Sequence, residues 1–369
     1  MLFLMDLPKP VHGMSNVNLA VLNKTLKLGL KPTVINTVPS YAARFFMSKY
    51  WGVFKLTHTF LCYFYMFFKL LFNFGGVVYR PINGGTGQVY DLVYIAICRV
   101  FFQKIFIHHH SFNYLNDHSS LFSVLNKIAG SATTHIVLGP KMGEKLTEHY
   151  GINKEKIRVV SNLAFFETVN NVEKRDTTNT VVLGHLANLC LEKGIALFLK
   201  VCSNLELLQI DFVAKIAGPF ADDDAKKMVL EAVAVNPNIK YLGPLYEEDK
   251  LEFYKSLDCF IFPSMYKNEA EPLVLYEAAL NGVFLAGTRK GCMKDVIESL
   301  SGFSVLETPS SDIAKEIAKS IKFQFDNQGF DLDKKTKRLV DFENEKVKAK
   351  EALIAFIDDM RNYDIPKVK

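Results

Sequence analysis

Two glutamates eight positions apart, Glu269 and Glu277, lie in the stretch NEAEPLVLYEAALNG at residues 268–282. Pro272 suits the first position of a helix, and Gly282 suits the residue just past its end. A capped surface helix would account for Glu269, which would complement the helix dipole. It would not account for Glu277, because apolar neighbours leave little polar surface around it. A charge in such surroundings needs a partner.

Two basic side chains occur beside glycines after other apolar runs. Lys193 precedes Gly194 in GHLANLCLEKGIALF (184–198), where the N–H groups of a helix start could seat a diphosphate. Arg289 lies between two glycines in GTRKGCMKDVI (287–297), which is a second plausible cradle for an anion. An exposed lysine is usually only solvated, but the adjacent glycine favours a binding role for Lys193.

Two glycine-containing turns occur in the first half of the chain. In PVHGMSNVNLA (10–20), Gly13 would let a ligand approach the backbone, although a plain turn between a strand and a helix would look the same. PINGGTGQ (81–88) lacks both the GxGxxG spacing and the trailing lysine of a phosphate loop. A flexible turn is the favoured interpretation there.

Three consecutive histidines end an apolar run in HHHSF (108–112), so that His108 and His110 share one face and His109 points to the other. They could bind a metal, contact a substrate hydroxyl or serve as structural side chains. Neither a cysteine nor a carboxylate is close in sequence to complete a zinc site. We therefore predict no metal and favour a substrate contact.

Apolar runs alternate with helix-length segments, which predicts parallel sheets with helices on both faces. The runs lie at residues 2–5, 32–37, 75–80, 104–110, 135–139 and 157–162, and again at 180–186, 212–218, 239–244, 258–264, 283–288 and 303–307. This pattern predicts an α/β fold of two tandem, doubly wound, Rossmann-like domains with a cleft between them. Ligands of such sheets bind beyond the carboxyl ends of the strands.

The expected domains are residues 1–165, a linker at 166–179, residues 180–340, and a helical segment at 341–369 that could cross back to the first domain. The linker is expected because periodicity is lost there and Asn, Thr and charged residues increase.

The chain has 369 residues, of which 49% are apolar and 22% are charged. This composition is typical of an ordered globular protein. Six scattered cysteines without a CxxC pair indicate a reducing compartment, so we expect a cytoplasmic protein. The start, MLFLMDLP, is expected to be a strand and not a signal peptide. Residues 1–160 carry 17 Lys or Arg against 6 Asp or Glu, a net of +11, which predicts an anionic partner for this half.

Residues 44–76 contain 13 aromatic residues, four Lys or Arg and no acidic residue. Lys55 and Lys69 leave only 13 residues between them, fewer than the roughly 20 apolar residues of a membrane-spanning helix. Two interpretations stay open. The segment could be helices packed into the first domain, or an amphipathic face lying on an anionic leaflet.

The spacing EAEPLVLYE, with Glu269 and Glu277 at its ends, resembles the E-x7-E motif of retaining glycosyltransferases of family 4, which have the two-domain GT-B fold. DCFIFPS, LEKG, VVSN, HGMS and FIHHHS also resemble landmarks of that family, and together they cover most of residues 8–297. The resemblance implies an acceptor-side first domain and a second domain that binds a nucleotide-sugar donor.

The resemblance implies a role for individual residues. Glu277 would accept hydrogen bonds from the ribose hydroxyls of the donor, and Glu269 would touch the transferred sugar. The N–H groups near Leu273 and Val274 would face phosphate or sugar oxygens, and Lys193 would bind the diphosphate.

Further matches concern the first domain and one departure from the pattern. His110 matches a histidine near the reacting face of the sugar, and Gly13 matches the glycine loop where acceptor and donor meet. Asn188 stands where the family usually has an arginine, and Arg289 or His185 are the candidate substitutes for its charge.

These matches imply a retaining hexosyltransferase that moves a sugar from a UDP- or GDP-type donor to a glycan, such as an O-antigen or another surface polysaccharide. No metal, other cofactor or nucleic acid is expected. The acceptor could be linked to a lipid diphosphate, with peripheral attachment at the inner face of the plasma membrane. The alternatives are a nucleotide-sugar hydrolase or epimerase of the same fold, and a catalytically inactive partner subunit.

Overall fold

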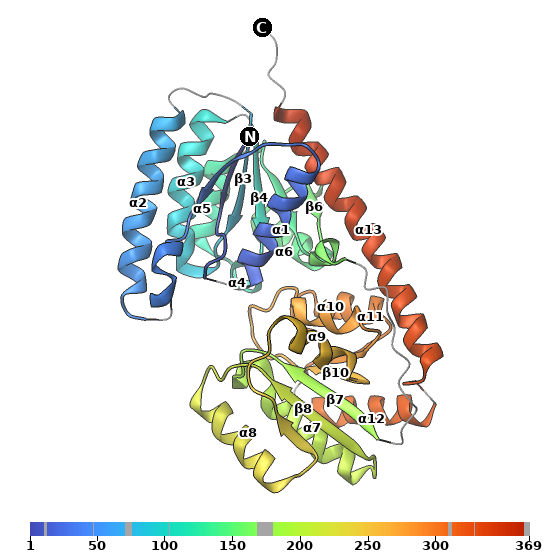
Figure 1. Ribbon diagram of the computed structural model, residues 1–369. Coiled ribbons are helices and arrows are strands. Elements are labelled where there is room, and N and C mark those ends of the chain that lie inside the picture. Colours follow the sequence, from blue (N-terminus) through green and yellow to red (C-terminus); the bar gives the residue numbers. More distant parts are fainter. Residues whose placement is uncertain are drawn as a thin grey trace. The chain divides into compact units, whose positions relative to one another are not determined.

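The structure, a computed structural model, describes residues 1–10, 13–46, 48–70, 76–102, 104–167, 180–308, 312–327 and 329–364. The chain divides into two compact units, which Figure 1 colours along the sequence. Unit 1 comprises Met1–Phe165 and Ala349–Lys369, and unit 2 comprises Phe166–Lys348. From residue 168 onward, the linker expected at 166–179 lies outside the described residues.

Unit 1 is built on six parallel strands in the order β2-β1-β3-β4-β5-β6. The strands are β1 (Leu2–Met5), β2 (Thr33–Asn36), β3 (Val77–Ile82), β4 (Lys104–His109), β5 (Thr134–Val137) and β6 (Ile157–Val159). Every residue of β3 and β4 is buried. Strands buried on both faces are continuous apolar runs. Each of the six predicted runs overlaps one strand, although β3 ends two residues after its run and β5 begins one residue before its run.

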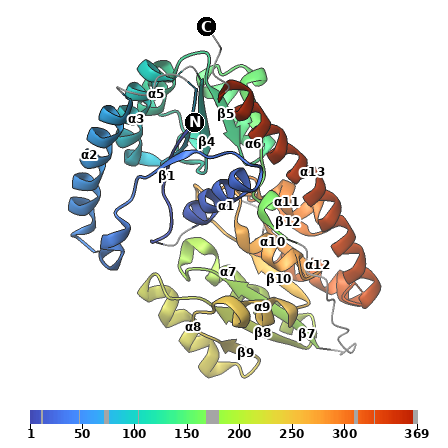
Figure 2. The same ribbon diagram turned by 45° about the horizontal axis from the view of Figure 1, so that its top comes forward.

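Helices cover both faces of this sheet. They are α1 (Gly13–Lys27), α2 (Trp51–Leu70), α3 (Gln88–Phe101), α4 (Asn113–Asn116), α5 (Ser120–Ala129) and α6 (Pro140–Tyr150), with short 3-10 turns η1 (Ser40–Phe45), η2 (Gly85–Gly87), η3 (Lys154–Lys156) and η4 (Asn162–Phe165). Figures 1 and 2 show α2, α3 and α5 on one side of the sheet and α1 on the other. Helix α6 lies on the side of α5, because Tyr150 of α6 packs against Phe122 of α5 with ring centroids 4.6 Å apart.

The long helix α13 (Leu332–Asp364) contributes its last turns, from Ala349 onward, to unit 1. Phe356 packs against Tyr79 and Phe106 of the sheet, with ring centroids 5.8 Å apart in both pairs. All three rings are at most 1% exposed, so the turn of α13 that carries Phe356 is part of the core of unit 1.

Unit 2 has a second sheet of six parallel strands in the order β12-β11-β10-β7-β8-β9. The strands are β7 (Val181–Leu186), β8 (Phe212–Ala217), β9 (Ile239–Tyr241), β10 (Cys259–Phe262), β11 (Phe284–Thr288) and β12 (Phe303–Val305). Around it lie η5 (Leu191–Lys193), α7 (Ile195–Leu207), α8 (Asp223–Val235), α9 (Glu247–Lys255), α10 (Leu273–Ala279), α11 (Met293–Ser299), α12 (Ile313–Asp326) and the first turns of α13. Each predicted run in this half also contains one strand.

Each sheet has a point where the chain reverses its direction of travel across the strands. In unit 1 it lies between β1 and β3, and in unit 2 between β7 and β10. The loops that leave such neighbouring strands diverge to opposite faces, so they open a space beyond the carboxyl ends. In unit 2 those two loops carry Lys193 and Glu269.

In unit 1, a buried ion pair lies beside β1 and β3, the two strands between which the strand order reverses. Arg80 of β3 donates from Nε to Asp91 of α3 at 3.0 Å, and both side chains are at most 2% exposed. Arg80 also donates to the carbonyl of Leu4 at 3.2 Å and to Thr37 Oγ1 at 2.9 Å. The pair therefore ties β3 to β1 and to the end of β2.

Candidate active site

The carboxyl ends of β7 and β10 bring together two side chains that are 76 positions apart in the sequence. Lys193 Nζ donates to Glu269 Oε2 at 2.7 Å, and Ser264 Oγ donates to the same oxygen at 2.8 Å. The ammonium of Lys193 also lies 4.8 Å from the ring centroid of Tyr266. The Lys193 side chain is 26% exposed and that of Glu269 is 10% exposed. An anion arriving from solvent can therefore reach the lysine.

Two glycines let the loops of this site approach each other closely. Gly194, just before α7, has a φ of +88°, and a Cβ there would lie 2.1 Å from the carbonyl oxygen of Pro263. Gly291, in the loop after β11, has a φ of +52°, and its Cβ would lie 2.1 Å from the carbonyl oxygen of Glu269. No other residue type fits either position without movement of the backbone. The two loops therefore hold the segment that carries Glu269.

Glu277 of α10 has its partners on α9. Lys250 Nζ donates to Glu277 Oε1 at 2.6 Å, and the Tyr254 hydroxyl donates to Oε2 at 2.8 Å. Burial, followed by the charge of Glu277, raises the pKa of Tyr254 well above its ordinary value, so this hydroxyl stays protonated. These contacts supply the partner that a charge among apolar neighbours needs. A carboxylate has about four acceptor positions, so Glu277 keeps capacity for a ligand.

The segment between the two glutamates forms the start of α10. Pro272 is the residue before the helix, and the helix begins with Leu273, one position later than predicted. Leu273 and Val274 lie half-buried in its first turn. N–H groups in a first turn have no acceptor within their own helix.

The position expected to hold a family arginine, Asn188, is exposed in the loop after β7. Of the two substitutes, His185 is fully buried and its Nδ1 lies 2.9 Å from the carbonyl oxygen of Ile261. Burial lowers the pKa of His185 to about 4, although that hydrogen bond acts in the opposite direction. His185 is therefore neutral near pH 7, and the expectation that it could replace the missing charge is wrong.

Arg289, the other substitute, is bound to side chains of β12 and α11. It donates from Nε to Ser304 Oγ at 2.9 Å, and its Nη2 lies 3.2 Å from Glu298 Oε1. These contacts compensate its charge locally. Among the basic residues named from the sequence, Lys193 is the one that the structure places beside Glu269.

The three consecutive histidines at the end of β4, His108 to His110, differ in environment. The rings of His108 and His110 are 4.1 Å apart on one face of the sheet, whereas His109 Nε2 lies 3.0 Å from His135 Nδ1 on the other. Burial lowers the pKa of His108 and His109 well below its ordinary value and that of His135 to about 3. His108, His109 and His135 are therefore neutral structural side chains.

His110 and Gly13 follow the carboxyl ends of β4 and β1, respectively. His110 is only half-buried. A Cβ at Gly13, the first residue of α1, would meet nothing within 4 Å, so packing among the described residues does not require a glycine there. In the described part of the chain, no group of three or more His, Cys, Asp or Glu side chains is arranged to hold a metal ion.

Sequence reasoning missed three side chains that hold the two glutamates, Ser264, Lys250 and Tyr254. The spacing of four positions between Lys250 and Tyr254 places both on one face of α9, and this signal was available in the sequence. It does not say which helix that face contacts. Ser264 follows β10 directly, and no sequence feature separates it from an ordinary turn serine.

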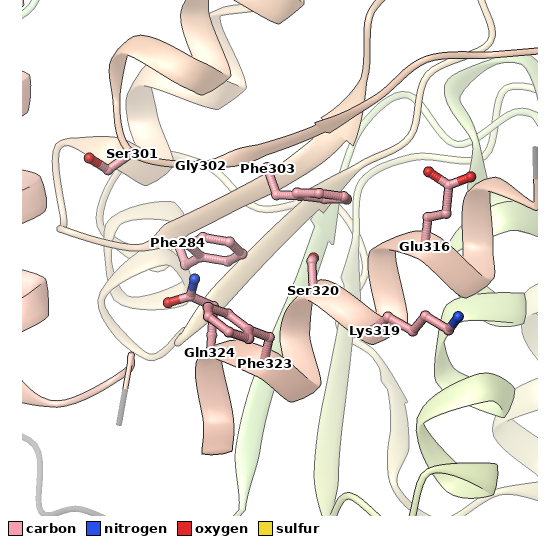
Figure 3. A pocket seen from close by; sticks show the side chains of 9 residues that line it. All are labelled: Phe284, Ser301, Gly302, Phe303, Glu316, Lys319, Ser320, Phe323 and Gln324. Carbon is pink, nitrogen blue, oxygen red and sulfur yellow. The ribbon is translucent and has the colours of Figure 1, made fainter. Parts of the chain in front are cut away.

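A pocket of about 460 Å³ lies elsewhere in unit 2, between α12 and the edge of the sheet (Figure 3). Phe284 and Phe303, the first residues of β11 and β12, line it together with Phe323 of α12. The amino ends of parallel strands lie at the opposite edge of the sheet from their carboxyl ends. This pocket is therefore separate from the site of Lys193 and Glu269.

Comparison with known proteins identifies the chemistry of unit 2. Residues 167–338 match the family model of glycosyl transferases group 1. This range contains Lys193, Glu269 and Glu277. The chain is a glycosyltransferase of the GT-B fold.

Solved structures similar to this glycosyltransferase share its fold at low sequence identity. A glycosyltransferase from Rickettsia africae ESF-5 has a TM-score of 0.71 at 16% identity, over 97% of this chain and 98% of that one. Anabaena Alr3699/HepE in complex with UDP has a TM-score of 0.66 at 15% identity, over 97% and 100% of the two chains. The pneumococcal O-GlcNAc transferase GtfA in complex with UDP and GlcNAc has a TM-score of 0.57 at 14% identity, over 81% and 59%. No curated protein matches the glycosyltransferase in sequence.

Proposed function

We propose that this glycosyltransferase moves a sugar, with retention of anomeric configuration, from a UDP- or GDP-type nucleotide sugar to a glycan acceptor. The observation that carries the proposal is the Lys193–Glu269 ion pair at the point where strand order reverses in unit 2. This position in a doubly wound sheet is where nucleotide ligands bind. A cation and a carboxylate there complement the two chemically different parts of the donor, its diphosphate and its sugar.

Lys193 would stabilise the negative charge that develops on the departing nucleoside diphosphate. The lysine is oriented by Glu269 before the donor arrives, and such preorganised charge accounts for much of enzymatic rate enhancement. Glu269 would accept hydrogen bonds from hydroxyls of the transferred sugar. The first-turn N–H groups of Leu273 and Val274 would contribute to phosphate or sugar contacts.

Glu277 would bind the ribose of the donor. Lys250 and Tyr254 occupy one position on each of its oxygens, so two acceptor positions remain for the two ribose hydroxyls. The helix α10 would then serve both ends of the ligand. Its first turn faces the diphosphate and the sugar, and Glu277 faces the nucleoside.

In unit 1, His110 and Gly13 would face the sugar and the acceptor. Retention would follow attack of the acceptor hydroxyl on the face from which the diphosphate leaves, with a phosphate oxygen taking the proton. We expect turnover without an added metal or other cofactor, because Lys193 and helix N-termini would supply the compensating charge. Undiminished turnover in EDTA is the expected result.

The acceptor that we propose is a surface glycan linked to a lipid diphosphate, used in the cytoplasm at the inner face of the plasma membrane. The excess of basic over acidic residues in the first 160 positions supports an anionic partner of this kind. Nucleic acid is not part of the proposal.

The test begins with the donor. UDP- and GDP-sugars are screened by thermal shift, because a ligand that binds the native state raises the melting temperature. The stabilising donor is then incubated with and without acceptor glycans. Nucleotide release that requires an acceptor supports transfer. Release without an acceptor would indicate a hydrolase, an altered sugar would indicate an epimerase, and no release under any condition would indicate an inactive subunit.

A matched pair of variants links the reaction to the site. Lys193→Met should abolish most turnover, whereas Lys227→Met, at a lysine of α8 whose side chain is 77% exposed, should leave it unchanged. Equal turnover in both variants would contradict the assigned role of Lys193.

A further inference from the structure

Helix α2 of unit 1 buries only a narrow stripe of its surface. The buried residues of this 20-residue helix are Thr59, Cys62, Met66 and Leu70, which recur every three or four positions and so line one face. Figures 1 and 2 show α2 as the outermost helix on its side of the sheet, next to α3. Most of the circumference of α2 therefore faces away from the core of unit 1.

The exposed side of α2 is apolar and aromatic. Its large exposed side chains include Phe60, Leu61, Phe64, Tyr65, Phe67 and Phe68. Phe60, Leu61 and Phe64 are 62%, 65% and 66% exposed. At about 100° per residue, these side chains occupy roughly half of the helix circumference. The exposed face of a helix in a water-soluble protein is normally polar, and a contiguous apolar patch marks an interaction surface.

Cations flank this face at both ends of α2, and acidic residues do not. Lys55 lies on the other side of the helix, where its Nζ is 5.5 Å from the ring centroid of Tyr90 of α3. Residues 44–76 contain Arg44, Lys49, Lys55 and Lys69 and no Asp or Glu. Lys69 Nζ lies 5.5 Å from the ring centroid of Tyr65 on α2, and Lys49 Nζ lies 5.3 Å from that of Tyr50 just before the helix. Lysines beside aromatic rings can keep their ammonium groups among headgroup phosphates while the rings enter the apolar boundary.

The positive charge beside α2 indicates which kind of partner binds this surface. Two copies of the chain joined through α2 would bring cations together with no acidic residue of this segment to pair with them. An anionic lipid surface would pair with them. Among the described residues no helix is long and apolar enough to cross a bilayer, so a spanning arrangement is excluded for α2.

We infer that α2 lies flat on an anionic phospholipid bilayer, with its exposed aromatic side chains below the headgroups and Lys49 and Lys69 among the phosphates. The inference gives the proposed membrane location a specific surface. It does not depend on the sugar-transfer chemistry, because lipid binding can be measured without donor or acceptor. It corresponds to the second of the two interpretations that the sequence left open for residues 44–76.

Trp51 is the only tryptophan of the chain and the first residue of α2, so it reports on this surface directly. Its fluorescence emission should shift to shorter wavelength with vesicles of phosphatidylcholine and phosphatidylglycerol, and should stay unchanged with phosphatidylcholine alone. Co-sedimentation with the anionic vesicles should weaken as salt is raised, because screening reduces the attraction. The same shift with neutral vesicles, or no shift with either, would overturn the proposal.

Two sets of variants separate the electrostatic contribution to vesicle binding from the contribution of apolar burial. Each lysine near an anionic surface is worth about a fivefold change in partitioning, so Lys49→Glu and Lys69→Glu together should weaken binding on the order of 25-fold or more. Phe60→Ser with Phe64→Ser should weaken it by a similar factor through loss of apolar burial. Because both phenylalanines are exposed, the protein should still fold.

The matched controls lie in unit 2. Leu207→Ser and Val235→Ser replace side chains that are 82% and 84% exposed, and Lys227→Glu reverses a surface charge on α8. These changes should leave vesicle binding intact. Equal loss in the controls would overturn the assignment to α2, as would conversion of a dimer to a monomer by Phe60→Ser and Phe64→Ser without any lipid binding by the unchanged protein. Donor-induced thermal shifts should be the same in all variants, so failure of the nucleotide-sugar proposal would be seen separately.

Discussion

The ion pair between Lys193 and Glu269 allows stability and activity to be separated by mutation. Lys193→Met removes the cation from a carboxylate that is 10% exposed, while the Ser264 hydrogen bond remains. Breaking a fully buried pair costs about 3–5 kcal/mol. The 26% exposure of Lys193 and the retained hydrogen bond reduce the expected cost to about 1–2 kcal/mol of unfolding free energy. For a unit of this size, that lowers the melting temperature by roughly 2–8 °C.

The effect on turnover should be larger. Removing one preorganised electrostatic group that stabilises developing charge typically costs about 10²–10³ in rate, or ~2.7–4 kcal/mol. We therefore expect kcat/KM of Lys193→Met to fall by that factor, measured as acceptor-dependent nucleotide release at saturating and limiting donor.

A second substitution distinguishes a catalytic role from a structural one. Adding Glu269→Gln to Lys193→Met removes the uncompensated charge and keeps a side chain that Ser264 can contact. The double variant should regain the free energy of unfolding of the unchanged protein to within about 0.5 kcal/mol and stay inactive. Recovery of turnover together with stability would refute the reasoning, and so would full turnover in Lys193→Met alone.

Three further outcomes are expected. Tyr254→Phe removes a hydrogen bond that orients the Glu277 carboxylate before the donor arrives, so it should lower the free energy of unfolding by about 1.5 kcal/mol and weaken donor binding measured by calorimetry, with little change in kcat; unchanged affinity would contradict the ribose role of Glu277. Gly291→Ala places a Cβ against the backbone of Glu269 in a left-handed conformation, so it should cost about 1–3 kcal/mol in urea unfolding and reduce turnover; a silent substitution would contradict the packing described here. The buried His135 has its pKa lowered to about 3, below that of the unfolded chain, so the unfolded state binds more protons as pH falls. Its contribution to stability is complete above about pH 6.5 and should be lost at up to ~1.4 kcal/mol per pH unit below it, seen as urea midpoints that decrease from pH 7 to pH 5 in the unchanged protein and decrease less in His135→Gln.

Local pattern was sufficient for the secondary structure of the sheets. Each of the twelve predicted runs overlaps a strand, and central strands such as β4 and β10 are buried on both faces and therefore largely apolar at successive positions. Two parallel sheets with flanking helices followed from the alternation of these runs with helical segments. The E-x7-E spacing also predicted a site, because Glu277 is a charge that needs a partner among apolar neighbours.

The pairing of distant side chains depended on strand order. Nothing in the residues around 193 or 269 says that β7 and β10 are neighbours, yet this adjacency alone places Lys193 2.7 Å from Glu269. The contact between His109 and His135 depends in the same way on the pairing of β4 with β5. Contacts of this kind join residues tens of positions apart, so local propensity does not encode them.

Burial was the other property that only the tertiary structure decided. The aromatic composition of residues 44–76 was compatible with a core helix and with a surface helix, since both are rich in apolar side chains. The answer depends on how much of the helix the neighbouring elements cover, and in unit 1 they cover only the stripe that contains Cys62 and Met66. Sequence by itself determined the strands and the two-sheet architecture, and it predicted the side chains of the candidate site. Tertiary structure decided which of those side chains meet and which surfaces stay exposed, because both depend on the order in which the elements pack.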